Sequence, residues 1–204
     1  MLEIVEPQAP VINLASSTLN STVNSDSFLI SGSVSSDAAA VSLTINSQPV
    51  ALSGAVSPYS FQHTIDFNNY LTDDVIVTMI ATDGDALSSE KTLTIYRDKL
   101  PPAITVSNPG IQIPPVVNRV IESPYLLSGT IVDASLSRFS INGQTILLTP
   151  DGAANSYAFN TALALPLNGE QLVVLDAWDK AGNHTSQEYL FNADVAVAIE
   201  IISP

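Results

Sequence analysis

The sequence predicts an all-β protein built from two consecutive two-sheet sandwiches. Apolar and polar residues alternate with a period of two, and turn residues punctuate the chain roughly every eight to twelve positions. Sequence landmarks also repeat at an interval of 96 to 98 residues. No window of helical length has a convincing apolar face, and 204 residues suit one large domain or two small ones.

The repeat defines the domain organisation. Five landmarks recur in the same order: Gly32 with Gly129, Asn46 with Asn142, Tyr59 and Phe61 with Tyr157 and Phe159, Asp83 with Asp179, and Asp98 with Asp194. We therefore assign residues 1-98 to a first sandwich and residues 99-194 to a second. Residues 195-204 have the form of an opening strand, and we expect them to begin a third, truncated repeat of a longer array.

Each element of a unit follows from its local pattern. In the first unit, strands are predicted over 28-34, 41-45, 60-65, 74-82 and 92-96. The inward side chains of two long strands are predicted to be Val75, Val77, Met79 and Ala81 in the first unit, and Val173, Leu175 and Ala177 in the second. The stretches "DGD" and "DKAGN" supply the turn residues of a hairpin between the last two strands. Pro101 and Pro102 stiffen the junction between the units.

Composition excludes several classes of function. The net charge is -14, and six basic residues cannot form the footprint that a nucleic-acid partner needs. An anionic membrane would repel the chain, and no stretch is long and apolar enough for membrane insertion. The absence of Cys excludes disulfides, zinc thiolate sites and cysteine nucleophiles. The first ten residues lack the features of a signal peptide, so we expect any export signal to lie outside this sequence.

The ordered motifs of the second unit resemble a known family. "AITVSNP", "LLSGTIVDAS", "FSINGQTI", "YAFNTALAL" and "LVVLDAWDKAGN" follow one another as in bacterial immunoglobulin-like domains, most closely those similar to the B domain of glucodextranase. The resemblance spans roughly 98 to 194 and is weaker in the first unit, which lacks the closing "AGN". It implies two tandem immunoglobulin-like β-sandwiches that serve as non-catalytic spacers or accessory modules and share no catalytic residues.

Calcium is the one cofactor for which the sequence offers candidate ligands. Asp83, Gly84 and Asp85 resemble the start of a calcium loop, but the twelfth position is Thr94 where an EF-hand requires Glu, so a plain turn is favoured. Asp98, Glu122 and Asp133 are the candidate metal ligands at the junction, where a cation could stiffen tandem sandwiches. Arg97 and Lys99 flank Asp98 and could neutralise it.

Trp178 is the candidate ligand-binding residue. The alternation directs it outward, together with Asp176, so it could stack on a sugar ring, with Tyr125 or Tyr157 as further contacts. Alternatively, it simply covers part of the sheet. His63 and His184 lie in no motif that would make either of them a general base, and we predict no catalytic residues.

Two functions remain open at this level. The first is a structural one, in which the units are spacers of a large exported bacterial surface protein or adhesin, with neighbouring immunoglobulin-like domains of the same chain as partners. The second is a carbohydrate-binding accessory module of a secreted polysaccharide-active enzyme. The first places the chain outside the cell or on its surface, with a carbohydrate or a host surface protein as the target of the parent molecule.

Overall fold

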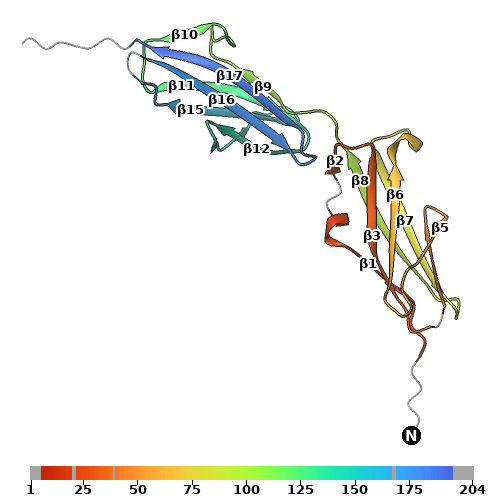
Figure 1. Cartoon of the computed structure of the whole chain (residues 1–204). Coiled ribbons are helices and arrows are strands. Elements are labelled where there is room, and N and C mark those ends of the chain that lie inside the picture. Colours follow the sequence, from red (N-terminus) through yellow and green to blue (C-terminus); the bar gives the residue numbers. More distant parts are fainter. Residues whose placement is uncertain (1–5, 20–21, 39, 167–168, 195–204) are drawn as a thin grey trace, which may run out of the picture. The chain divides into compact units, whose positions relative to one another are not determined.

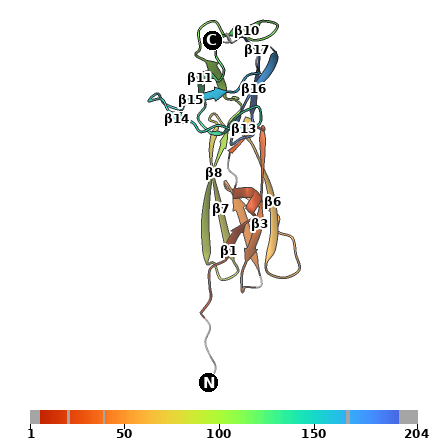
Figure 2. The ribbon, with the colours of Figure 1, turned by 90° about the vertical axis from the view of Figure 1, so that its left-hand side faces the viewer.

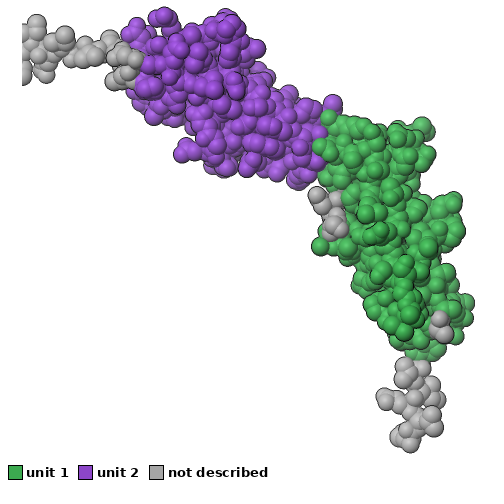
Figure 3. Space-filling view, viewed as in Figure 1, with its two compact units in different colours: residues 1–99 green, residues 100–204 purple. Residues whose placement is uncertain are grey.

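The computed structural model describes residues 6-19, 22-38, 40-166 and 169-194. The chain forms two compact units, Met1–Lys99 and Leu100–Pro204 (Figures 1 and 3). Each is an immunoglobulin-like sandwich of two β-sheets with its own core. The predicted third repeat, residues 195-204, lies outside the described residues.

Unit 1 packs a three-stranded sheet against a five-stranded one. The smaller sheet has the order β1 (Val11–Leu14), β3 (Ser27–Ser35), β6 (Tyr59–Asp66). The larger has the order β2 (Thr22–Val23), β8 (Ser88–Arg97), β7 (Asp74–Asp83), β4 (Val41–Ile45), β5 (Gln48–Val50). Neighbouring strands are antiparallel except β2 and β8. Figure 2 shows β7 and β8 in one layer and β3 and β6 in the other.

Unit 2 repeats this plan with one more short strand. Its smaller sheet has the order β14 (Thr149–Pro150), β15 (Ser156–Leu163), β11 (Tyr125–Val132), β9 (Ala103–Val106). Its larger sheet has the order β10 (Val117–Val120), β17 (His184–Ala193), β16 (Glu170–Asp179), β12 (Leu136–Ile141), β13 (Gln144–Thr145). The long hairpin of β16 and β17 is prominent in Figure 1. The repeat found in the sequence is therefore a repeat of topology.

The predicted inward side chains form the two cores. Val75, Val77, Met79 and Ala81 are at most 1% exposed, and Val173, Leu175 and Ala177 are fully buried. Large side chains of the opposite sheet meet them, among them Ile30 and Phe61 in unit 1 and Leu127 and Phe159 in unit 2. The alternation with a period of two thus decides which side chains of each strand are buried in the core.

The glycine landmark of the repeat marks a tight approach between strands. A Cβ on Gly32 would lie 2.2 Å from the carbonyl oxygen of Asn13 and 2.9 Å from Cζ of Phe61. Gly129 stands in the same relation to Thr105 and Phe159, at 2.2 and 2.5 Å. Both glycines sit in the middle strands β3 and β11, where the neighbouring backbone and a buried phenyl ring leave no room for a side chain.

The asparagine landmark fixes a hairpin turn. Asn46 and Asn142 adopt positive φ angles of 47° and 51°, which asparagine tolerates better than most residues. The side-chain oxygen of Asn46 accepts a 2.8 Å hydrogen bond from the Thr78 amide, and that of Asn142 accepts one of 2.8 Å from the Val174 amide. Each asparagine therefore ties its hairpin to the long central strand of its sheet.

Two short 3-10 turns, η1 (Ser16–Leu19) and η2 (Phe67–Asn69), are the helical elements of the described residues. Within this part of the chain no helix reaches the length and apolarity needed to cross a bilayer.

We expect Gly32→Ala to destabilise unit 1 by about 2 kcal/mol, because the added methyl group must displace the Asn13 backbone. Gly84→Ala is the matched control, since its Cβ would meet nothing closer than Ala40 at 3.7 Å. Urea unfolding followed by circular dichroism compares the midpoints. Equal stability of the two variants would show that β1 adjusts freely.

Candidate functional site

Trp178 lies on the outer face of the larger sheet of unit 2, as predicted. It occupies the middle of three strands, with Arg138 of β12 and His184 of β17 as its direct cross-strand neighbours. The Arg138 guanidinium carbon lies 3.9 Å from the indole centroid, and the His184 ring stacks at 4.3 Å with an interplanar angle of 9°. His184 Nε2 is also 2.9 Å from Oδ1 of Asp176.

Both faces of the indole are therefore covered. Because β12 and β17 flank β16 on opposite sides, Arg138 and His184 approach the ring from opposite sides. A sugar ring would need to displace one of them before it could stack. The protein would then lose a cation–π contact or an aromatic contact. The indole is half-buried, which supports the alternative that Trp178 covers part of its own sheet.

The same three positions in unit 1 carry hydroxyl groups. Ser42, Thr82 and Ser88 occupy the places of Arg138, Trp178 and His184 in the repeat. The Ser42 hydroxyl donates to the Thr82 carbonyl at 3.2 Å, and the Thr82 and Ser88 hydroxyls lie 2.8 Å apart. Both units thus connect these strands through outward side chains, with different chemistry.

The structure does not bring Trp178 together with the two tyrosines expected to assist it. Tyr125 and Tyr157 lie at inward positions of the other sheet, Tyr125 opposite Leu163 at one end and Tyr157 opposite Ile131 at the other. The Tyr125 ring packs 5.5 Å from that of Phe191, and its burial raises the pKa of its hydroxyl. The three aromatics therefore do not form one surface for a sugar.

Aspartate side chains cap the β7–β8 and β16–β17 hairpins. The first of these hairpins contains the stretch that resembles the start of a calcium loop. Oδ1 of Asp83 accepts hydrogen bonds from the backbone amides of Asp85 and Leu87 at 3.0 and 2.9 Å. Asp179 accepts 2.8 Å and 2.7 Å hydrogen bonds from the amide and the side-chain nitrogen of Asn183. These are side-chain caps of tight turns, and they confirm the turn interpretation.

The candidate metal ligands Glu122 and Asp133 lie apart. Glu122 precedes β11 and Asp133 follows it, so the whole eight-residue strand separates them. At roughly 3.3 Å per residue that distance exceeds 20 Å. The structure places Asp133 beside Asp179 instead, with carboxylate oxygens within 4.8 Å of each other, and these side chains are 8% and 4% exposed.

Asp98 follows β8 at the end of unit 1, where its amide donates to the Val23 carbonyl at 2.8 Å. The two neighbouring cations form ion pairs with carboxylates of unit 1. Arg97 pairs with Asp73 at 2.7 Å and with Asp26 at 3.2 Å, and Lys99 pairs with Asp26. The Lys99 ammonium holds the pKa of Asp26 below its usual value. Arg97 and Lys99 thus both form ion pairs with Asp26, and neutralisation of Asp98 by them stays a prediction.

Calcium ligation by Asp98 and Asp133 stays a prediction. If Asp133 is a ligand, calcium must raise the unfolding temperature of the folded chain, because a cation bound only to the native state stabilises it. Asp133→Asn must then abolish that rise. An equal response to calcium in both proteins would remove Asp133 from the ligand set.

The histidines lie in different units and do not form a catalytic arrangement within the described residues. His63 is half-buried in β6, opposite Ile30. His184 contacts Asp176 and Trp178, and no hydroxyl lies within hydrogen-bond distance of its ring in this part of the chain.

Comparison with known proteins finds no matching family model and no matching curated protein. Among solved structures, the chain is similar to the fibronectin(III)-like modules of Clostridium thermocellum CbhA, with 15% identity over 91% of this chain and 95% of that one, and a TM-score of 0.49. It is also similar to a 1.5-MDa bacterial ice-binding adhesin, with 20% identity over 93% and 66% of the two chains and a TM-score of 0.37. A tetra-tandem repeat from the extending region of a large adhesion protein shares 18% identity over 89% and 48%, with a TM-score of 0.34.

Arg138 and Trp178 should be energetically coupled. In a double-mutant cycle with Arg138→Ala and Trp178→Ala, we expect a coupling free energy of about 0.5 to 1 kcal/mol from the cation–π contact at a partly exposed site. Chemical unfolding monitored by circular dichroism measures all four proteins. Simple additivity would mean that the guanidinium contributes nothing to holding the indole.

Asp83→Ala should destabilise unit 1 by about 1 to 3 kcal/mol, because two backbone amides of the β7–β8 hairpin lose their acceptor. Asp85→Ala removes the same charge two residues away from an exposed side chain and serves as the control, with an expected change within about 0.5 kcal/mol. Thermal or urea unfolding distinguishes them. Comparable losses in the two variants would assign the effect to net charge rather than to the cap.

Proposed function

We propose that the chain consists of non-catalytic, structural immunoglobulin-like domains of a large exported bacterial surface protein or adhesin. The observation that carries the proposal is the duplication of a complete sandwich, with its own core in each unit. A molecule can be lengthened by adding further copies of such a module. Each copy can fold by itself because it has its own hydrophobic core.

The chemistry of the described residues supports a structural role. The acidic landmarks Asp83 and Asp179 cap hairpins, and Trp178 is clamped between two neighbours. Pro101 and Pro102 lie at the start of unit 2, next to its junction with unit 1, and two adjacent prolines limit backbone freedom at that point. A spacer needs stable modules and stiff connections, and these residues serve both needs.

The parent protein provides the direct test of the spacer role. Electron microscopy of the full-length molecule should show an extended region in the part that contains these residues, with a functional head at a distance. A compact parent, in which the two units pack around a catalytic domain, would contradict the proposal and favour the accessory-module alternative.

Single-molecule pulling tests whether the two units are separate domains. With handles at both ends, the chain should give two unfolding events, each releasing about 300 Å of extended polypeptide, as expected for roughly 90 ordered residues. Gly32→Ala should lower the force of one event and leave the other unchanged. One event of double length would show that the two units unfold as a single cooperative body.

A further inference from the structure

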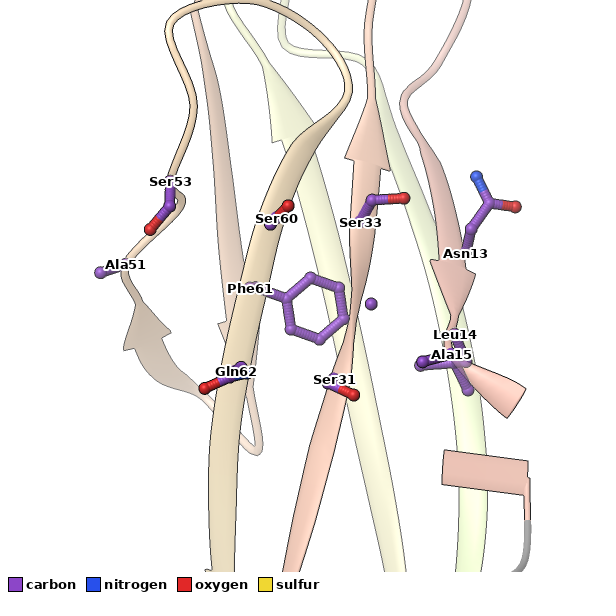
Figure 4. A pocket seen from close by; sticks show the side chains of 11 residues that line it. Asn13, Leu14, Ala15, Ser31, Ser33, Ala51, Ser53, Ser60, Phe61 and Gln62 are labelled. Atoms are coloured by element: carbon purple, nitrogen blue, oxygen red, sulfur yellow. The ribbon is translucent and has the colours of Figure 1, made fainter. Parts of the chain in front are cut away.

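The outer face of the smaller sheet of unit 1 carries a trough of about 750 Å³. Figure 4 shows its lining side chains, which come from β1, β3, β6 and the segment after β5. We call it the serine trough and define it by Asn13, Ser31, Ser33, Ser53, Ser60 and Gln62.

Four of these residues form one row across the sheet. Asn13 pairs with Ser33, Ser33 with Ser60, and Ser60 with Ser53. At about 4.8 Å between neighbouring strands, the row spans about 14 Å. Ser31 and Gln62 are cross-strand partners in the next row on the same face (Figure 4). The trough is thus long enough for an oligomeric ligand.

The polar side chains of the trough are available for a ligand. Within the described part of the chain, the side chains of these six residues make no hydrogen bond to another protein group. Each serine hydroxyl both donates and accepts, and each carboxamide offers two donors and an acceptor. The serine trough therefore presents a regular array of neutral donors and acceptors.

The lining of the serine trough is uncharged. The chain has 20 acidic and six basic residues, yet none of them lines the serine trough. An anionic ligand would find no cation there. Because Phe61 at the floor of the trough is only 2% exposed, a ligand would be held by hydrogen bonds and not by stacking on an aromatic ring. A neutral ligand rich in hydroxyl groups can form hydrogen bonds with the hydroxyl and amide side chains of the trough. Its binding would bury no charge.

We infer that the serine trough is a binding site for a neutral oligosaccharide. This inference is independent of the spacer role, and it places sugar binding in unit 1 and not at Trp178 of unit 2. Unit 2 provides an internal comparison, because its corresponding row reads Thr105, Thr130, Ala158 and Thr149. That row has one polar group fewer, and the Thr149 hydroxyl donates to the Ala158 carbonyl at 3.4 Å.

The test uses the whole 204-residue chain on an array of neutral gluco-, manno-, galacto- and xylo-oligosaccharides and of acidic, uronate-containing ones. At least one neutral series should be retained and the acidic series should not. Retention of no neutral glycan, or equal retention of acidic glycans, would overturn the inference.

Variants then locate the site by calorimetry with the best-retained glycan. Ser60→Trp fills the serine trough and should weaken binding at least tenfold, whereas Ala158→Trp at the matching position of unit 2 should leave it unchanged. The double variant Ser33→Ala, Ser60→Ala keeps the trough open, removes two hydroxyls and should also weaken binding at least tenfold. Wild-type affinity of that double variant, or an equal loss in Ala158→Trp, would place the glycan elsewhere.

Discussion

The burial of every second side chain between two sheets is the interaction on which the rest of this protein depends. With no cysteine to form a disulfide, each sandwich is held by apolar packing and by the hydrogen bonds of its strands. Residues such as Met79 and Ile30 in unit 1, or Leu175 and Phe191 in unit 2, are completely buried. At about 25 cal/mol per Å² of apolar surface, even a small change to such a core is expensive, which leaves the inward positions little freedom.

The outward positions carry no such constraint, and there the two units differ. Arg138, Trp178 and His184 form a stacked cluster where Ser42, Thr82 and Ser88 form a hydroxyl cluster. On the smaller sheet, the positions of the serine trough in unit 1 correspond to a row of threonines and alanine in unit 2. The two units thus share a fold and present different outer surfaces.

Several residues that resemble functional groups in the sequence serve the architecture. The carboxylate of Asp83 caps a hairpin, the amide of Asn46 ties a turn to β7, and Arg97 and Lys99 pair with Asp26 at the end of unit 1. Acidic residues are frequent in tight turns because their oxygens accept backbone amides, which is the same property that makes them metal ligands. Composition alone therefore cannot separate the two uses.

The sequence by itself determined the all-β class, the duplication and the inward side chains, because a period of two and a repeat of 96 to 98 residues are local or one-dimensional signals. It also placed Trp178 on the outer face. Only the tertiary structure decided which outward residues meet. It set Glu122 and Asp133 at opposite ends of β11, covered both faces of Trp178, and aligned Asn13, Ser33, Ser60 and Ser53. Those neighbours come from different strands, and strand order and register arise from the packing of the whole sandwich.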